Sequence, residues 1–307
     1  MTLNYFDNIV EKVILKSPLQ KKKLKQYLAS KDVTFFADAE KFAQNYAGYL
    51  DSQLIPLDYA VSAYTEMCDN MMKCQIEFMK TGKYTVDEHL EAYEKVYSNE
   101  TKMKSYMIGL AISQFLWSTH YEMYCSFAVG IRRLSNGIKS YLEIGPGHGL
   151  YLQKAMEYLP KAAKITLVDI SPVSIAITKS IMDYFKYDYM SIDFRMGDIL
   201  DFDSTNKYDF ITMGEVLEHV NYPERLLIKL YDLLQNNGRL FLSTCVNAPA
   251  IDHVYHFKKV DEIVDMVRKC GFVIEDERIL PVENLPIELI IEKKIAINYC
   301  AILTKKI

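Results

Sequence analysis

Three glycines at alternate positions are the most chemically suggestive residues of this sequence. They lie in residues 141–149, Tyr-Leu-Glu-Ile-Gly-Pro-Gly-His-Gly, where Gly145, Gly147 and Gly149 follow an apolar run that contains Glu143. Because glycine has no Cβ, such a loop lets the backbone approach a ligand closely. A helical pattern begins directly after the loop, and the first N–H groups of a helix are free to bind an anion or a carboxylate. The segment predicts a ligand-binding loop between a strand and a helix, although a glycine-rich turn alone is a weak signal.

Two aspartates at the ends of later strand patterns could bind the sugar and the base of a nucleoside. Asp169 ends the strand pattern in Leu-Val-Asp-Ile-Ser and is followed by Ile170, while Asp198 lies in Met-Gly-Asp-Ile and is followed by Ile199. A carboxylate at the first position can accept hydrogen bonds from both ribose hydroxyls, as it does in NAD enzymes. Asp198 could accept the adenine amino group with Ile199 packed on the ring, and an Asx turn is an equally good interpretation of this residue.

Three histidines follow later strand patterns and are candidates for a general base. His219 ends the segment Gly-Glu-Val-Leu-Glu-His, in which Glu215 is the first acidic residue. His253 and His256 lie in Asp-His-Val-Tyr-His-Phe, after the next strand pattern. Imidazole takes up a proton near neutral pH, so these histidines are the predicted catalytic groups if the reaction releases a proton.

The elements that must position these residues are of two kinds, and the first kind is helical. Residues 1–136 are predicted to form helices, because apolar residues recur there at spacings of three and four and strand-like alternation is absent. One helix is predicted over 56–80, ending near Gly82, and the capping box Thr85-Val86-Asp87-Glu88 predicts the start of another. Two more are predicted at 100–117 and 119–134, and we expect the last of them to cover the ligand cleft.

From residue 137 onward strands and helices alternate, which is typical of a mostly parallel sheet with helices on both faces. The predicted strands are 140–144, 164–169, 192–196, 208–213, 239–244, 272–280 and 295–304. The predicted helices are 149–158, 172–185, 222–234 and 260–270. The predicted fold class is α/β, a Rossmann-like seven-stranded, mostly parallel sheet preceded by an all-α N-terminal domain. We expect a helical lid or substrate domain at 1–136 and the sheet domain at 137–307.

This ordered series of motifs resembles the class I S-adenosylmethionine-dependent methyltransferases. The resemblance covers about residues 139–307 and rests on the glycine loop, the two strand-end aspartates, Gly-Glu-Val-Leu-Glu-His, the turn Asn-Asn-Gly-Arg-Leu and the later Cys-Gly-Phe. The glycine spacing differs from the G-x-G-x-x-G of dinucleotide-binding domains. The resemblance implies S-adenosylmethionine as the cofactor and an antiparallel last strand.

The resemblance also implies a role for each motif. The glycine loop and the glutamate before it would contact or order the methionine half of the cofactor. The first strand-end aspartate would hold the ribose, and the second, with its neighbouring isoleucine, would hold the adenine. The glutamate after the fourth strand would lie beside the reacting centre. The implied cofactor-binding residues are Glu143, Gly145, Gly147, Asp169, Ile170, Asp198, Ile199 and Glu215.

A divalent metal is a second cofactor to consider. Glu215, Glu218, His219 and His253 resemble the Glu-x-x-Glu-His plus distal histidine set of magnesium-dependent small-RNA 2′-O-methyltransferases, and in part that of ubiquinone-pathway O-methyltransferases. Two carboxylates and two imidazoles suit Mg²⁺, Mn²⁺ or Fe²⁺. Because Glu-Val-Leu-Glu-His is also common in metal-free members, where it shapes a turn, a metal stays open but is not the favoured interpretation.

Composition and charge limit the partners and the location. The formal net charge of −4 disfavours a nucleic-acid partner. The six cysteines form no C-x-x-C pair, which is typical of reduced thiols in a cytoplasmic protein. No signal peptide is recognised, and the apolar stretch 107–131 is interrupted by Gln114, His120 and Glu122, so we expect a buried helix and no membrane partner. A homodimer is left open.

Taken together, the motifs predict S-adenosylmethionine-dependent methyl transfer to an O, N or C atom of a small-molecule substrate. Two alternatives keep the cofactor, namely aminocarboxypropyl transfer and a non-catalytic S-adenosylmethionine-binding module. NAD-dependent chemistry is disfavoured by the glycine spacing. Substrate identity is expected to reside in the helical part, whose aromatic residues, such as Tyr106 and Trp117, are individually better explained as core than as pocket lining.

Overall fold

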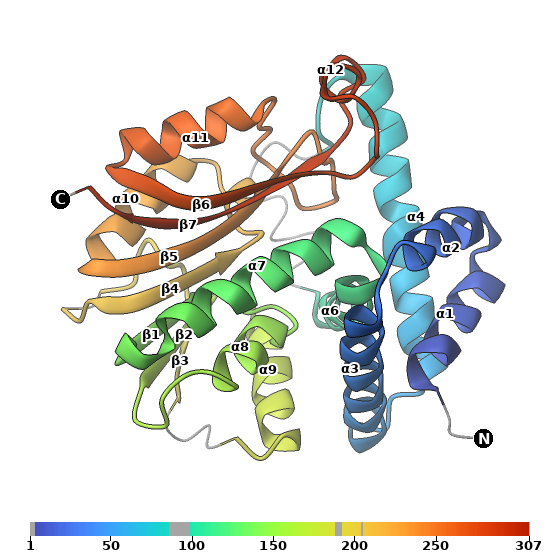
Figure 1. Cartoon of the computed structure of the whole chain (residues 1–307), viewed down its shortest axis with the longest axis horizontal. Coiled ribbons are helices and arrows are strands. Elements are labelled where there is room, and N and C mark those ends of the chain that lie inside the picture. Colours follow the sequence, from blue (N-terminus) through green and yellow to red (C-terminus); the bar gives the residue numbers. More distant parts are fainter. Residues whose placement is uncertain (1–3, 86–98, 188–191, 204, 307) are drawn as a thin grey trace.

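The computed structural model describes residues 4–85, 99–187, 192–203 and 205–306. Helices precede the first strand, as predicted; most of them lie to one side of the sheet, and the last long helix runs along its strands (Figure 1). They are α1 (Tyr5–Lys16), η1 (Pro18–Gln20), α2 (Lys21–Ala29), α3 (Val33–Ser52), α4 (Leu57–Thr81), α6 (Glu100–Leu116), α7 (Ser118–Leu134) and η3 (Ser135–Gly137). The helix that the capping box predicts falls within 86–98, outside the described residues.

The ends of these helices follow from local side-chain chemistry. The side chains of Asn4, Asp32 and Asn99 each accept a hydrogen bond from a backbone N–H in the first turn of α1, α3 and α6. Such caps satisfy donors that have no partner within the helix. At its other end α4 stops at Gly82, whose φ of 70° is left-handed, and this confirms the predicted helix end.

The sheet has seven strands in the order β3-β2-β1-β4-β5-β7-β6. Its strands are β1 (Ser140–Ile144), β2 (Lys164–Asp169), β3 (Ile192–Met196), β4 (Tyr208–Gly214), β5 (Leu234–Val246), β6 (Phe272–Pro281) and β7 (Ile297–Lys305). β1 to β5 pair in parallel, and β7 pairs antiparallel with both β5 and β6. The predicted fold class and the antiparallel last strand are both confirmed.

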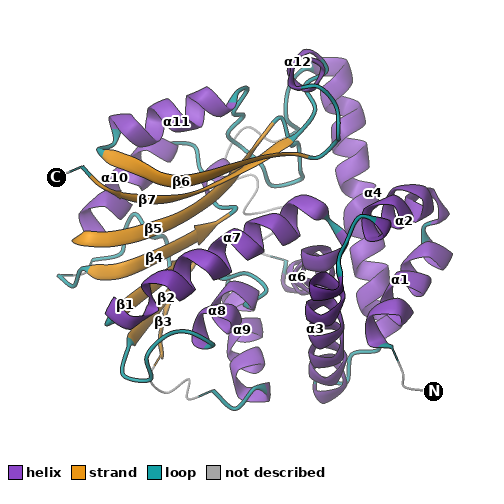
Figure 2. Cartoon of the chain, in the orientation of Figure 1, coloured by secondary structure: helices purple, strands orange, loops and turns teal. Residues whose placement is uncertain are grey.

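Helices cover both faces of this sheet (Figure 2). The elements of the second half are α8 (Leu150–Met156), α9 (Pro172–Tyr184), η5 (Leu217–His219), α10 (Pro223–Leu233), α11 (Val260–Lys269) and α12 (Ile287–Glu292). One core joins α7, α8 and α9 to the sheet, and a second core joins α10 and α11 to the other face. The pattern did not predict α12, because it has six residues and buries only Ile290, which is too little for a helical periodicity.

The helical part and the sheet share one of these cores. The first core contains Phe6 of α1, Tyr64 of α4 and Phe127 of α7 together with Tyr141 and Phe210 of the sheet. Helix α7 packs on β5, β6 and β7, although it lies before the sheet in the sequence. The domain division at residue 136 stays a prediction, and the shared core indicates that the two parts are held firmly against each other.

The apolar stretch 107–131, which the sequence predicts to be buried, falls on α6 and α7. Among the described helices, none has the length and apolar character that crossing a bilayer requires. α6 buries ten of its residues, including Ser113 and Gln114. The prediction of a buried segment over 107–131 is therefore confirmed for α6 and for the inner face of α7.

Candidate active site

A large chamber lies at the carboxyl ends of the parallel strands. Its volume is about 680 Å³, and its walls come from the loops after β1, β2, β3, β4 and β5 and from α4, α6 and α7. A volume of this size suits a drug-sized ligand. The crevice outside the carboxyl ends of parallel strands is also where open α/β sheets bind their ligands.

The glycine loop lines this chamber in the conformation that its sequence predicts. Gly145, Gly147 and Gly149 have φ values of 64°, 53° and 73°, a region that other residues adopt only with strain. The backbone N–H of Gly145 donates to the carbonyl of Val168 at 2.9 Å, which ties the loop to the end of β2. A Cβ on Gly145 would lie 2.7 Å from Cγ2 of Val216. The loop therefore needs glycine both for its backbone and for its close contact.

The two aspartates meet at the same edge. Asp169 is buried, lines the chamber and accepts a hydrogen bond at Oδ1 from the N–H of Ser171 at 2.7 Å. The backbone N–H of Gly197 donates to the carbonyl of Asp169 at 2.9 Å, which brings the loop of Asp198 beside it. Asp198 lines the chamber too, and its Oδ1 accepts from the N–H of Leu200 at 2.8 Å. Asp198 therefore forms an Asx turn and also lines the chamber, so the two interpretations of this residue are compatible.

Burial makes the carboxyl group of Asp169 a weaker acid than usual. Removal from water raises the pKa of its carboxyl to about 6, and hydrogen bonds from the loop oppose that rise only in part. A carboxylate in this state gains from any ligand that donates hydrogen bonds to it. Two vicinal hydroxyls would satisfy this requirement.

Glu143 does not reach the chamber. It points into the protein, where its Oε2 accepts a hydrogen bond from the hydroxyl of Tyr141 at 2.6 Å, and burial raises its pKa to about 7. Tyr141 and Glu143 lie two positions apart on β1, so they share a face of the sheet. Of the two predicted roles for Glu143, contacting the ligand or ordering the loop, the structure favours the second.

Glu215 is the strained residue of the site. Its φ of 53° is left-handed, which is uncommon for a glutamate. Its Oε2 accepts from Nδ2 of Asn298 at 3.1 Å, whereas Oε1 is buried without a hydrogen-bond partner among the described residues. Burial, followed by the nearby Glu218 carboxylate, raises its pKa well above the ordinary value. Strain and an unpaired buried oxygen in a chamber wall are typical of a ligand-binding residue.

The rings of His219 and His253 are in contact in the wall of the chamber. Their rings lie 4.8 Å apart, centroid to centroid, and meet edge to face at 89°. Nδ1 of His219 donates to the backbone carbonyl of Asp252 at 2.9 Å. Nδ1 of His253 donates to the carbonyl of Ala248 at 2.6 Å. In His253 this bond fixes the hydrogen on Nδ1, so Nε2 is the nitrogen that can take a proton or a ligand.

The two histidines differ in basicity because their neighbours differ. Burial lowers the pKa of His219, but the Asp252 and Glu218 carboxylates outweigh burial and the net pKa is raised. Burial and the neighbouring His219 lower the pKa of His253. One imidazole is therefore inclined to carry a charge while the other stays neutral, which separates acid and base roles.

The predicted metal set is only partly assembled. Glu218, His219 and His253 each bring a ligand atom within 4.8 Å of the others, and Glu215, Glu218 and Cys245 form a second such group. The four predicted residues do not form one group. Glu218 is fully buried, and its Oε2 accepts from the hydroxyl of Thr244 at 2.8 Å. The geometry allows a divalent cation at the first group without requiring one.

His256, the third predicted base, is absent from the lining of the chamber. Its Nε2 donates to Oδ1 of Asn247 at 2.8 Å, and its ring packs against Phe78 and Tyr84. Its position in the sequence, three residues after His253, did not show this difference. Along an irregular loop the direction of a side chain is decided by the backbone turns, which spacing alone does not predict.

The helices supply an apolar wall that the sequence did not identify. Tyr106 and Trp117 line the chamber, so here the core interpretation was incomplete. His120 at the start of α7 lines it as well, which confirms that this helix covers the cleft. The wall also contains five methionines, a residue whose flexible thioether adapts to varied ligands. They are Met71, Met72, Met103, Met107 and Met123.

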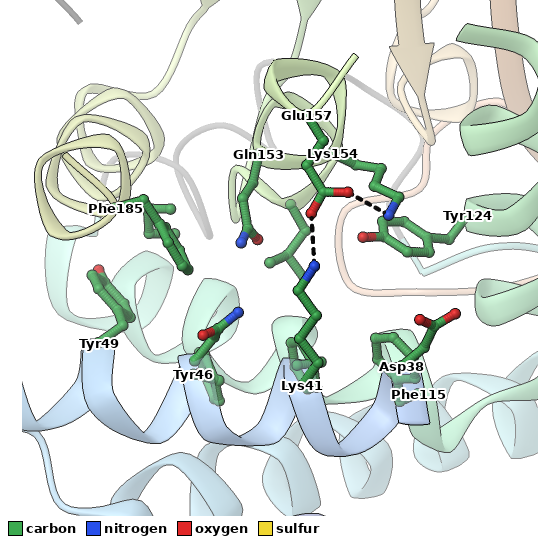
Figure 3. A pocket seen from close by; sticks show the side chains of 14 residues that line it. Asp38, Lys41, Tyr46, Tyr49, Phe115, Tyr124, Gln153, Lys154, Glu157 and Phe185 are labelled. Carbon is green, nitrogen blue, oxygen red and sulfur yellow. Dashed lines mark hydrogen bonds and ion pairs between the residues drawn. The ribbon is translucent and has the colours of Figure 1, made fainter. Parts of the chain in front are cut away.

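Two other cavities lie against the helices: one of about 530 Å³ lined by residues of α3, α6 and α9, and one of about 50 Å³ between α3, α8 and α9 (Figure 3). Lys41 of α3 and Lys154 of α8 both pair with Glu157, at 3.4 and 2.7 Å. None of the motif residues described above as ligand-binding or catalytic lines either cavity. The large chamber is therefore the candidate active site.

Comparison with known proteins places the chain in a family. A family model described as "Methyltransferase domain" matches residues 120–275, about half of the 307-residue chain. The chain therefore belongs to this family and is a class I S-adenosylmethionine-dependent methyltransferase by fold and motifs. The family's cofactor, S-adenosylmethionine, agrees with the ordered series of motifs in the sequence.

Curated relatives match only part of the chain. Malonyl-[acyl-carrier protein] O-methyltransferase 1 of Ilyobacter polytropus is 28% identical over 141 residues, which are 42% of this chain and 51% of that protein. Ubiquinone biosynthesis O-methyltransferase of Nitrosococcus oceani is 27% identical over 190 residues, which are 55% of this chain and 78% of that protein. The chain thus spans about half the length of the first relative.

Solved structures share the fold at low sequence identity. Mitomycin 7-O-methyltransferase MmcR has a TM-score of 0.54 at 11% identity, covering 81% of this chain and 70% of that one. Human N-acetylserotonin methyltransferase has a TM-score of 0.52 at 16% identity with the same two coverages. Because 81% of the chain exceeds the sheet part, the shared fold includes some of the N-terminal helices.

Proposed function

We propose that this protein transfers the methyl group of S-adenosylmethionine to an O, N or C atom of a small-molecule acceptor. One observation supports the proposal most directly. A single chamber joins the glycine loop, Asp169 and Asp198 at one end to His219 and His253 at the other. An adenosyl ligand and an acceptor can therefore lie in one chamber, with their reacting atoms in contact.

The residues of the first end fit the cofactor by their own chemistry. Asp169 would accept from the ribose hydroxyls, and Asp198 with Ile199 would hold the adenine, as the family motif implies. The turn at Gly145 and Gly147 admits a ligand against the backbone. When bound, the cofactor supplies a methyl group that is already activated by its sulfonium charge, so the protein's task is mainly orientation, worth on the order of 7–11 kcal/mol.

Glu215 lies at the junction of the two ends. Its unpaired, buried Oε1 is an acceptor that a cationic group would satisfy. A positive charge beside Oε1 would favour the ionised form of Glu215, because a nearby cation lowers the pKa of a carboxyl group. We therefore assign Glu215 to the cationic part of the cofactor.

The histidine pair serves an acceptor that loses a proton. His253 is the better base of the two, because burial and His219 keep it neutral and its Nδ1 already donates to a carbonyl. His219, held by Asp252, would remain charged and orient the neighbouring polar groups. A positioned base of this kind contributes about 10²- to 10⁴-fold to a rate. An acceptor that carries no proton would not need it.

The acceptor is proposed to have an apolar body. Tyr106, Trp117 and the methionine wall make the helical side of the chamber largely apolar. The relatives named above act in ubiquinone biosynthesis and on malonyl-acyl-carrier protein. Phenols and carboxylic acids are therefore the first acceptors to test, and no particular one is assigned here.

No metal is part of the proposal. Glu218, His219 and His253 could hold a divalent cation by their spacing, and Oε1 of Glu218, 4.0 Å from Nε2 of His219, has no hydrogen-bond partner among the described residues. Elemental analysis of the purified protein and activity after treatment with a chelator test this choice. A stoichiometric metal together with loss of activity in chelator would overturn it.

The cofactor proposal is tested by calorimetry with S-adenosylhomocysteine. Binding in the micromolar range with one site is expected. A folded protein that does not bind S-adenosylhomocysteine would end the proposal.

The reaction is tested by turnover of S-adenosylmethionine with a panel of phenols and carboxylic acids. The product S-adenosylhomocysteine supports methyl transfer, whereas methylthioadenosine would indicate aminocarboxypropyl transfer. His253→Gln should lower kcat while leaving the affinity for S-adenosylhomocysteine within about threefold, because its ring lies at the acceptor end. Equal losses in both quantities would show a structural role for His253.

A further inference from the structure

The loop that carries His253 is held from outside the chamber by the end of α4. Tyr84 follows the Gly82 cap of α4 and lies in the helical part, before residue 120 where the family match begins. Its hydroxyl accepts a hydrogen bond from the backbone N–H of Ala248 at 3.0 Å, across 164 positions of sequence. Tyr84 does not line the chamber, whereas Ala248 does.

Ala248 is also the partner of His253. Its carbonyl accepts from Nδ1 of His253 at 2.6 Å, and the sulfur of Cys245 lies 3.7 Å from the same nitrogen. A carbonyl oxygen only accepts, so Nδ1 of His253 must carry the hydrogen. Nε2 is then the nitrogen with a free lone pair, which is the atom that can take a proton or a ligand. The backbone of one residue therefore links the Tyr84 hydroxyl to the tautomer of His253.

Aromatic packing strengthens this attachment. The ring of Tyr84 lies 4.6 Å from the ring of His256 at an interplanar angle of 32°, and Phe78 meets His256 edge to face at 5.1 Å. His256 in turn donates to Asn247, the residue directly before Ala248. His256 thus connects α4 to the loop and has a place in the site without reaching the chamber.

The base of the loop is closed independently of the helices. The N–H of Asn247 donates to the carbonyl of Phe257 at 3.0 Å, and Asn247 adopts a left-handed φ of 50°. The two ends of the loop are therefore fixed together. Between them, the N–H groups of Val254 and Tyr255 donate to the carbonyl of Glu218 at 2.9 Å each, after His253 in the sequence. Before His253, the hydroxyl of Tyr84 holds the stretch at Ala248, the residue whose carbonyl accepts from His253.

We propose that Tyr84 is a positioning residue of the active site, which sets the ring orientation and the Nδ1–H tautomer of His253 through the backbone of Ala248. The importance of that tautomer for catalysis rests on the proposed function; the link from Tyr84 to His253 does not. The proposal gives the helical part a second task besides walling the chamber. It also explains why a tyrosine remote from the acceptor contacts the loop after β5.

The test is the tautomer of His253 in the full-length protein, measured by nitrogen-15 NMR of a histidine-labelled sample at neutral pH. The His253 signals are assigned by their absence in His253→Gln. Tyr84→Phe keeps the ring against His256 and removes only the hydroxyl. In this variant the ratio of the Nδ1–H to the Nε2–H form of His253 should fall about fivefold, the factor that one ordinary hydrogen bond contributes to an equilibrium.

Tyr49→Phe is the matched control. Tyr49 is a tyrosine of the helical part whose hydroxyl bonds to Ser180 at 2.8 Å, away from the loop after β5. It should leave the His253 tautomer ratio unchanged. A Tyr84→Phe variant that behaves like Tyr49→Phe would overturn the proposal.

Two further measurements keep the result interpretable. Exchange of the Ala248 amide hydrogen in the unaltered protein should be slow, because Tyr84 accepts it, and rapid exchange would overturn the proposal without any variant. S-adenosylhomocysteine affinity should be the same in all three proteins within about twofold, because no tyrosine tested touches the first end of the chamber. If the unaltered protein does not bind S-adenosylhomocysteine, the proposed function falls, while the tautomer result still decides the role of Tyr84.

Discussion

The two ends of the chamber are built in different ways. The end proposed for the cofactor comes from one stretch, residues 144–199, in which Asp169 ends β2 and Asp198 lies two residues after β3. The acceptor end combines Met71 of α4, Tyr106 of α6 and His253 of the loop after β5. The first end depends on backbone turns at a sheet edge, and the second depends on how distant elements pack. We infer that the first end sets which cofactor binds and that the second sets what is methylated.

The largest effect should follow from removing the ribose acceptor at the cofactor end. Asp169→Ala should weaken S-adenosylhomocysteine binding about 100-fold or more, because two hydrogen bonds to a charged group are lost at about 1.5–3 kcal/mol each. Calorimetry measures the effect. Asp193→Ala is the control, since Asp193 is an exposed residue of β3 paired with Arg195 at 2.8 Å. A loss smaller than threefold would remove Asp169 from the cofactor end.

The second prediction tests whether the two ends of the chamber are independent, by altering the crossing of α6 and α4. A Cβ on Gly109 of α6 would lie 2.7 Å from backbone atoms of Ala63 and Tyr64 in α4, and backbone cannot move aside easily. Gly109→Ala should lower the free energy of unfolding by about 1–3 kcal/mol, as overpacking does. Denaturant titration measures this change.

Gly137→Ala is the control for that variant, because nothing lies within 4 Å of a Cβ there. Binding of S-adenosylhomocysteine by Gly109→Ala should stay within about threefold, because the crossing belongs to the acceptor side. A large loss of cofactor affinity would show that the two ends are coupled and would break the comparison.

The third prediction addresses the glycine loop itself. Gly145→Ala introduces a side chain at a φ of 64° and a contact of 2.7 Å with the flexible end of Val216. Because a left-handed alanine costs about 1–2 kcal/mol, affinity for S-adenosylhomocysteine should fall about tenfold. The same Gly137→Ala control applies, and calorimetry is again the measurement. Unchanged affinity would mean that the loop conformation is not needed for binding.

The smallest predicted effect is a pH dependence of binding. Burial raises the pKa of Asp169 to about 6 in the protein without ligand. Donated hydrogen bonds from a ribose favour the ionised form, so binding lowers this pKa. Affinity should therefore be full above about pH 7 and be lost as the pH falls through 6, by about three- to fivefold at pH 5.5. Asp169→Asn should abolish this slope, and a slope that persists would assign it to another group.

Much of the fold could be predicted from the sequence because local rules decide it. The strands β1, β2 and β3 begin and end where the alternation of apolar segments and turns predicts, and Gly82 ends α4 by its left-handed backbone. The short helix α12 escaped prediction because it is too brief for a pattern. The start of β5 at Leu234, five residues before its predicted start, depends on pairing with β4, which no local pattern specifies.

The sequence by itself predicted the end of the chamber that is proposed to bind the cofactor. Glycines at alternate positions and aspartates at strand ends predict that end because carboxyl ends of parallel strands converge at one edge, whatever the rest of the chain does. Only the tertiary structure decided that Glu143 turns inward to Tyr141, that His253 enters the chamber while His256 leaves it, and that Tyr84 reaches the loop. Those outcomes depend on packing between residues far apart in the chain, and the spacing of residue types carries no record of such contacts.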